Sequence, residues 1–132
     1  MECSLQRAVM AVLVVAGYLT TISLDVAVAQ TPQQYCSSSA PEDPVKYYSY
    51  AEKVMNALVK RAPYTSTRMF KAWYPNKKVG SVTGAATCYN NDAGRCKDCL
   101  KALKASMEGC KMSITGGSFG TGCNMQFWRV VD

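Results

Sequence analysis

Six cysteines constrain the fold of this chain more than any other feature of its sequence. The chain has 132 residues and seven cysteines, but Cys3 lies in a segment that we expect to be removed. In a small exported chain, the remaining six predict three disulfide bonds, with several possible connectivities. A domain of about 100 residues buries only a modest core, so covalent bonds matter to its stability. The six cysteines are Cys36, Cys88, Cys96, Cys99, Cys110 and Cys123.

Residues 1–29 have the features of a secretory signal peptide. A short start with one basic residue precedes residues 8–24, which are uncharged and mostly apolar. Ala27 and Ala29 then place small residues at the two positions that a signal peptidase reads. The apolar run is shorter than the roughly 20 residues that a membrane-spanning helix needs. We therefore predict a cleaved signal peptide, a mature domain over residues 30–132, and secretion to the extracellular space.

The predicted mature domain is basic and lacks histidine. The whole chain has 15 basic and 9 acidic residues; removing Glu2, Arg7 and Asp25 leaves 14 and 7, a net charge of +7. Such a charge favours acidic partners such as anionic lipid or wall polymers, but it also keeps a secreted protein soluble. Secretion argues against nucleic acid as a partner. Without histidine, the usual general base and the commonest metal ligand are missing. No recognisable pair of carboxylates replaces it, so we expect no enzyme activity, metal or cofactor.

Two segments have the pattern of amphipathic helices. In the first, apolar side chains recur at helical spacing from Pro44, after the capping residue Asp43, to about Arg61. The second begins after Asp92 and gathers its cysteines, leucines and methionine on one stripe. The opposite stripe is basic, and we expect its lysines to face solvent: Lys97, Lys101 and Lys104.

The rest of the chain predicts an antiparallel sheet. Segments rich in β-branched or aromatic residues favour strands. The glycine-rich residues 115–122 favour a hairpin loop between the last two strands, and the polar residues 31–42 favour a loop before the first helix. This order predicts an α+β domain with its helices on one face of the sheet. The predicted strands are residues 65–74, 79–89, 111–114 and 123–131.

Cys96 and Cys99 have the two-residue spacing of a thioredoxin-like redox pair. Such a pair lies at the start of a helix that follows a parallel strand, where one thiolate is stabilised. No such parallel unit surrounds this pair, and four other cysteines compete for the same partners, so we favour a structural role. Zinc binding is an alternative, but zinc sites usually combine two short motifs and this chain has one.

The spacing of the cysteines resembles that of a plant family. Counting from Cys88, the next four cysteines follow after seven, two, ten and twelve residues, while Cys36 lies far upstream. The segment TGAATC leads into Cys88, and CNMQF begins at Cys123. This pattern resembles the cysteine-rich domain of ginkbilobin, also called the stress-antifungal domain. The domain also occurs in cysteine-rich receptor-like kinases, plasmodesmata-located proteins and cysteine-rich repeat secretory proteins. The family usually has one residue more between the first two of these cysteines.

The resemblance implies a fold and a set of cysteine pairs. The fold is α+β, with two helices packed on a five-stranded antiparallel sheet and three disulfides. The family's pairs, carried over to this chain, are Cys36–Cys110, Cys88–Cys96 and Cys99–Cys123.

The resemblance also implies three ligand positions. Ginkbilobin resembles a mannose-binding antifungal lectin. Its sugar contacts are an asparagine just after the first cysteine, an arginine before the last, and a glutamate five residues after the last. At these positions the present chain has Ser37, Gly117 and Trp128, so the family's polar contacts are not kept.

Three hypotheses of function follow. The first is a secreted, defence-related, antifungal protein of the plant apoplast that binds cell-wall glycan or mannose, with Trp128 as a stacking platform beside Asn124 and Gln126. In the alternative reading of Trp128, the first helix or the N-terminal segment covers its ring. The second hypothesis is a cationic protein that acts on microbial membranes or anionic wall polymers through its lysine stripe. The third is a protein-interaction module. No oligomeric state follows from the sequence.

Overall fold

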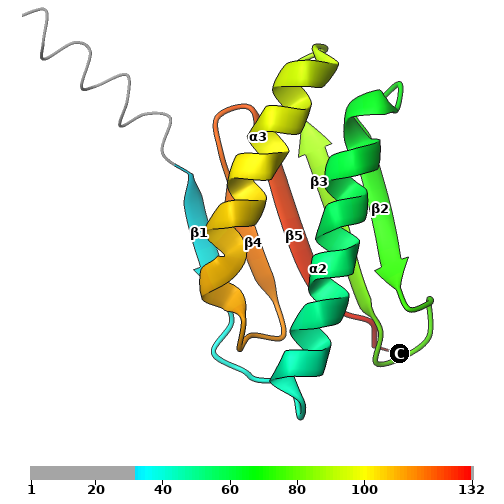
Figure 1. Ribbon diagram of the computed structural model, residues 1–132, viewed down its shortest axis with the longest axis vertical. Coiled ribbons are helices and arrows are strands. Elements are labelled where there is room, and N and C mark those ends of the chain that lie inside the picture. The colour runs from blue at the N-terminus through cyan, green and yellow to red at the C-terminus, as the bar shows by residue number, and fades with distance from the viewer. Residues whose placement is uncertain (1–31, 132) are drawn as a thin grey trace, which may run out of the picture. The chain divides into compact units, whose positions relative to one another are not determined.

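The five-stranded antiparallel sheet carries both helices on one of its faces (Figure 1). The structure, a computed structural model, describes residues 32–131. The predicted signal peptide, residues 1–29, lies outside the described residues. Within them, no helix has the length and apolar content that crossing a membrane requires. The elements in chain order are β1 (Gln33–Cys36), α2 (Pro44–Arg61), η1 (Ala62–Tyr64), β2 (Met69–Tyr74), β3 (Val82–Cys88), α3 (Ala93–Ser106), η2 (Met107–Cys110), β4 (Gly116–Phe119) and β5 (Cys123–Arg129).

The sheet has the strand order β1-β4-β5-β3-β2, which places the last strand at its centre. Side chains alternate between the two faces of a strand, and β5 follows this rule. Its residues Cys123, Met125 and Phe127 are fully buried beneath the helices, while the residues between them are half-buried on the other face. The alternation that places Trp128 beside Asn124 and Gln126 is therefore confirmed, although the strand ends at Arg129 and not at Val131. One apolar core lies between the sheet and the helices.

Both helices begin at the residues that the sequence predicts. The Asp43 carboxylate accepts a hydrogen bond from the Lys46 backbone N–H at 3.1 Å, and Pro44 occupies the first turn of α2. The Asp92 carboxylate accepts the corresponding bond from the Arg95 N–H at 3.0 Å. This backbone hydrogen bond is the main cause that lowers the pKa of Asp92. Each carboxylate thus caps a helix at its positive end.

The six cysteines form the three pairs that the resemblance implies. Cys36–Cys110 ties β1 to η2 across 74 residues, Cys88–Cys96 ties β3 to α3, and Cys99–Cys123 ties α3 to β5. The two cysteines with redox spacing, Cys96 and Cys99, are therefore bonded to different partners. Neither serves as half of a thioredoxin-like pair, and none of the six is a free thiolate for zinc.

Two predictions about local structure are wrong. Residues 31–42 are predicted as loop, but β1 lies within them and pairs with β4. Residues 111–114 are predicted as a strand and 115–122 as a loop. Instead, a turn follows η2, where the Ser113 N–H donates to the Cys110 carbonyl at 3.0 Å, and the fourth strand, β4, lies in the glycine-rich segment. The sheet thus has the five strands that the resemblance implies. Two of them, β1 and β4, lie where the sequence predicted loops, and residues 111–114 are in none of the five.

Candidate functional site

The face of the sheet that neither α2 nor α3 covers is the first candidate surface, called here the open face. The register places corresponding side chains of all five strands on it. Aromatic side chains are frequent there, together with an amide and an ammonium group. Its members used below are Tyr35, Lys71, Trp73, Thr83, Phe119, Gln126 and Trp128.

Two tryptophans share one row of the open face. Thr83 pairs with Trp73 on one side and with Trp128 on the other. Neighbouring strands lie about 4.8 Å apart, so the two tryptophan backbones are separated by roughly 10 Å. Thr83 is only 3% exposed between them, although neither α2 nor α3 covers this face. Both tryptophans are half-buried and lie on the two sides of Thr83.

An ammonium group stands beside both tryptophan rings. Lys71 Nζ lies 5.6 Å from the centre of the Trp73 ring and 5.8 Å from that of Trp128. Lys77 Nζ lies 4.4 Å from the centre of the Trp73 ring. These distances allow cation–π attraction. The row thus combines two aromatic rings with the lysine ammonium groups that lie over them.

Tyr35 and Gln126 extend the open face toward its β1 edge. The Tyr35 hydroxyl donates to Gln126 Oε1 at 3.3 Å, which leaves the amide nitrogen of Gln126 as a donor. The Tyr35 ring stacks on Phe119 at a centroid distance of 5.9 Å. It also lies over Gly117, where an added Cβ would come within 2.3 Å of Tyr35 Cε1. A side chain at residue 117 is therefore excluded while the ring stays in place.

Of the three ligand positions implied by the resemblance, Gly117 and Trp128 lie on the adjacent strands β4 and β5, and Ser37 directly follows β1. The three differ in what they can offer a ligand. Ser37 Oγ accepts from the Thr115 N–H at 3.1 Å and donates to the Ser39 carbonyl at 3.4 Å, so it bonds within the fold. Gly117 lies beneath the ring of Tyr35. Trp128 is half-buried on the open face, which neither helix covers.

Sequence reasoning missed five members of this surface: Tyr35, Lys71, Trp73, Thr83 and Phe119. Alternation along residues 69–74 could have placed Lys71 and Trp73 on one side of a strand. The strand order that brings them to Trp128 joins segments far apart in the chain, and no local pattern predicts it.

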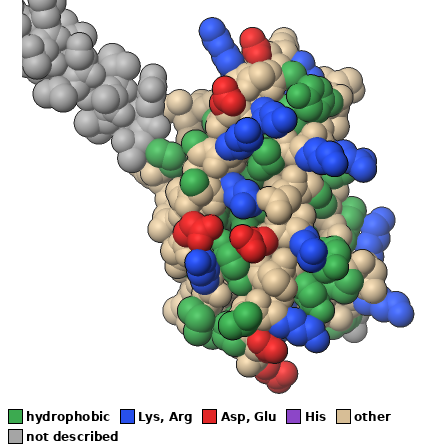
Figure 2. Space-filling view, viewed as in Figure 1, with side chains coloured by type: hydrophobic (Ala, Val, Ile, Leu, Met, Phe, Trp, Pro, Cys, Tyr) green, Lys and Arg blue, Asp and Glu red, His purple; other side chains and the backbone are tan. Residues whose placement is uncertain are grey.

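The lysine stripe of α3 forms the second candidate surface. Lys97, Lys101 and Lys104 line a groove of about 480 Å³ between α2 and α3, together with residues of α2. The expectation that all three face solvent holds for Lys101; Lys97 and Lys104 are half-buried because α2 packs beside them. Figure 2 shows basic side chains along this helical side of the molecule. The remaining lining residues are Asn56, Val59, Lys60, Ala105 and Glu108.

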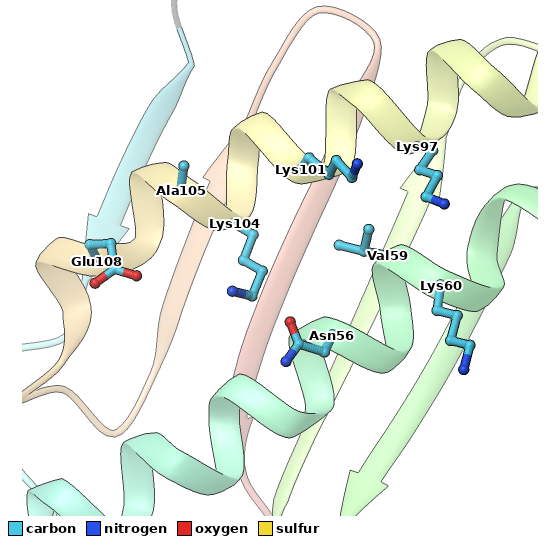
Figure 3. A pocket seen from close by; sticks show the side chains of 8 residues that line it. All are labelled: Asn56, Val59, Lys60, Lys97, Lys101, Lys104, Ala105 and Glu108. Carbon is cyan, nitrogen blue, oxygen red and sulfur yellow. The ribbon is translucent and has the colours of Figure 1, made fainter.

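Within this interhelical groove, two lysines approach the opposite helix. Figure 3 shows Lys97 and Lys104 extending from α3 toward α2, and Val59 extending from α2 toward α3. Glu108 lies at one end and forms an ion pair with Lys111, with Oε1 and Nζ 3.0 Å apart. Over residues 32–131, none of the four groove lysines forms an ion pair with a carboxylate. The groove is therefore a concave surface with a net positive charge.

No group of three or more histidine, cysteine or acidic side chains that could hold a metal occurs over residues 32–131. The titratable groups with clearly shifted pKa values in this range serve structure. Tyr47 and Tyr48 are buried, and each donates to a backbone carbonyl. What the two surfaces offer is binding, through aromatic stacking on one and positive charge on the other.

Comparison with known proteins shows what this fold is similar to. No family model matches the chain, and no curated protein matches its sequence. The solved tandem DUF26 ectodomain of the Arabidopsis thaliana cysteine-rich receptor-like protein PDLP5 matches with a TM-score of 0.63 and 19% identity over 73% of this chain. That of PDLP8, from the same plant, matches with a TM-score of 0.58 and 19% identity over 75%. The chain spans 48% and 44% of these two structures. The likeness shows that residues 32–131 have the fold of a DUF26 domain.

Proposed function

We propose that this chain is a secreted, non-enzymatic plant domain of the DUF26 and ginkbilobin type, and that it binds a neutral cell-wall glycan on its open face. The observation that carries the proposal is the pair Trp73 and Trp128, which flank Thr83 on the helix-free side with the Lys71 ammonium beside both rings. Binding of fungal wall glycan would give the protein an antifungal, defence-related role in the apoplast.

The chemistry of this row suits a sugar. Aromatic faces pack against the apolar C–H surfaces of a pyranose ring. Correctly placed donors then hold the hydroxyls, and the Gln126 amide and the Lys71 ammonium would supply these donors in the proposed complex. A glycan bound here would use other contacts than the family's mannose ligands, because Ser37 bonds within the fold and Tyr35 covers Gly117.

Three disulfides support the extracellular part of the proposal. Such bonds form and persist in oxidising compartments, and in chains of this size they are typical of secreted proteins. The solved structures of similar fold are ectodomains of plant receptor-like proteins, which agrees with that location.

The test is a titration of the mature protein with mannan-type and other neutral wall oligosaccharides, followed by tryptophan fluorescence and calorimetry. We expect binding with a shift in emission, and Trp128→Ala and Trp73→Ala should each lower the affinity about tenfold or more, because a stacking surface is lost. The matched control is Tyr64→Ala, which removes an exposed aromatic ring outside the open face.

Equal affinities of the three variants would overturn the proposal, and so would the absence of binding to every neutral glycan tested. Each variant is first compared with the wild type by circular dichroism and urea unfolding, so that loss of fold is not mistaken for loss of binding.

A second candidate function is protein recognition by the same face. Two large aromatic side chains stack on each other and are exposed at its β1 edge, at 41% for Tyr35 and 44% for Phe119. Clustered apolar side chains on a surface mark interaction sites. This candidate predicts that Tyr35→Ser and Phe119→Ser abolish capture of a receptor ectodomain and leave glycan binding unchanged.

A further inference from the structure

We propose that the interhelical groove is a second binding site, separate from the open face, and that its ligand is a linear carboxylated polysaccharide. The groove lies on the helical side of the sheet, so a polymer bound there does not compete for the open face.

Charge is the first argument. Three lysines from α3 line the groove, while Lys60 lies at its outer edge on α2 and points away from α3 (Figure 3). Over residues 32–131, none of the four is neutralised by an ion pair. The one acidic side chain in the lining, Glu108, lies at its end and is paired with Lys111. Lys97, Lys101 and Lys104 follow each other along α3 over about 10 Å, at 1.5 Å per residue. A ligand with regularly repeated negative charges matches such a row.

Shape is the second argument. The volume of about 480 Å³ falls in the range of pockets that hold small molecules or short oligomers. Lys97 and Lys104 extend into this space toward α2, instead of standing outward from a convex surface (Figure 3). Positive charge that is directed into a concave channel favours a narrow chain lying inside it over a flat surface that touches only its edges.

The lining favours carboxylated polysaccharide over the other polyanions. Single-stranded nucleic acid is held by aromatic stacking platforms, and the groove lining contains no aromatic side chain. Helices that bind lipid surfaces flank their lysines with large apolar residues, whereas Val59, recessed, and Ala105 are the apolar residues here. Asn56 adds an amide that can bond sugar hydroxyls.

The first experiment measures the affinity of the complete mature protein for oligogalacturonates of defined size. The variant Lys97→Gln/Lys101→Gln/Lys104→Gln should bind at least about tenfold more weakly than the wild type, because three charge contacts are lost. The matched control is Lys46→Gln/Lys53→Gln/Lys78→Gln, which removes the same charge outside the groove lining. It should keep wild-type affinity within about twofold at an ionic strength near 0.15 M, where distant charges are screened.

A second pair of variants tests the groove without changing any charge. Ala105→Phe places a ring in the groove lining, whereas Ala102→Phe places one at an exposed position of the same helix that is not part of the lining. We expect Ala105→Phe to lower the affinity to that of the triple groove variant, and Ala102→Phe to leave it unchanged.

Three results would overturn the proposal. Equal weakening by both triple lysine variants would mean that net charge alone attracts the polymer. Unchanged binding by Ala105→Phe would place the polymer outside the groove. The site would belong to another ligand if polyglutamate, single-stranded DNA or phosphatidylserine vesicles bound in the groove with an affinity equal to or higher than that of oligogalacturonate. Trp128→Ala should bind oligogalacturonate like the wild type, so failure of the open-face proposal is distinguished from failure of this one.

Discussion

At the scale of single residues, Gly84 determines how closely α2 approaches the sheet. A Cβ at this position would lie 2.6 Å from Val54 Cγ1 and 2.8 Å from the carbonyl oxygen of Gln126. Neither atom can move without cost, because Val54 is 1% exposed and the carbonyl belongs to the central strand. Any side chain at residue 84 therefore separates the helix from the sheet that it covers.

We predict that Gly84→Ala lowers the free energy of unfolding by about 1–3 kcal/mol, the usual cost of overpacking a core. Urea unfolding with the disulfides intact measures this change. In the control Gly122→Ala, the nearest heavy atom to the new Cβ would be Cys99 Sγ at 3.6 Å, an ordinary contact. Identical unfolding midpoints for the two variants would show that the helix yields without cost.

The candidate site was only partly predictable at this scale. Alternation along the last strand places Trp128 with Asn124 and Gln126 away from the core, and the structure agrees. Its neighbour in the row, Trp73, lies two strands away in the sheet and 55 positions away in the chain. Their proximity depends on strand pairing, which the pattern within one strand does not contain.

At the scale of elements, two tyrosines attach α2 to the segment between α3 and β4. The Tyr47 hydroxyl donates to the Ile114 carbonyl at 2.6 Å, and the Tyr48 hydroxyl donates to the Met107 carbonyl at 3.3 Å. Burial raises the pKa of each tyrosine to about 12, and nearby carboxylates contribute for Tyr48. Both hydroxyls therefore stay protonated in the folded state well above the pH at which an exposed tyrosine ionises.

The raised pKa values of Tyr47 and Tyr48 determine how the stability of the fold changes with pH. An unfolded tyrosine ionises near pH 10, so the stabilisation by Tyr47 and Tyr48 is fully present below about pH 10 and is lost as the pH rises toward 12. We predict that stability falls over this range and that the double variant Tyr47→Phe/Tyr48→Phe falls less steeply. Urea midpoints at successive pH values measure the slope.

Tyr64→Phe is the matched control, because it removes the hydroxyl of a tyrosine residue that is 67% exposed. An ultraviolet titration of the folded protein provides a second check. If all tyrosines ionised together near pH 10, the proposed role of the two buried hydroxyls would be wrong.

The helices were predictable element by element, but β1 and β4 were not. Helix signals are local, because capping residues and apolar spacing occur within one segment, and α2 begins and ends where they indicate. β4 begins with two glycines, which disfavour a strand in isolation. They fit here because the rings of Phe127 and Tyr35 occupy the space that side chains at residues 116 and 117 would need. Contacts from other strands thus determine this element.

At the scale of the whole molecule, the three disulfides differ in the length of chain that they close. Cys36–Cys110 spans 74 residues, Cys99–Cys123 spans 24, and Cys88–Cys96 spans 8. In the chain-entropy description, a bond restricts the unfolded state more when its loop is longer. The bond that holds the edge strand β1 to η2 should therefore contribute most to stability.

We predict that Cys36→Ala/Cys110→Ala lowers the free energy of unfolding by roughly 4 kcal/mol, against roughly 2.5 kcal/mol for Cys88→Ala/Cys96→Ala. The two double variants remove the same atoms, so their difference reports loop length. Calorimetric melting or urea unfolding measures both. A larger loss for the short loop would mean that local packing around each bond outweighs chain entropy.

The pairing of Cys36 with Cys110 also has a consequence for the order of oxidation. A chain delivered N-terminus first into an oxidising compartment presents Cys36 before any other cysteine of residues 32–131. Cys88, Cys96 and Cys99 all arrive before the correct partner. The first thiol to arrive thus meets three wrong partners, and a mispaired bond is corrected only by attack of another thiolate. Maturation of this domain should therefore depend on thiol–disulfide exchange, and an isomerase should raise the yield of folded protein more than an oxidant alone.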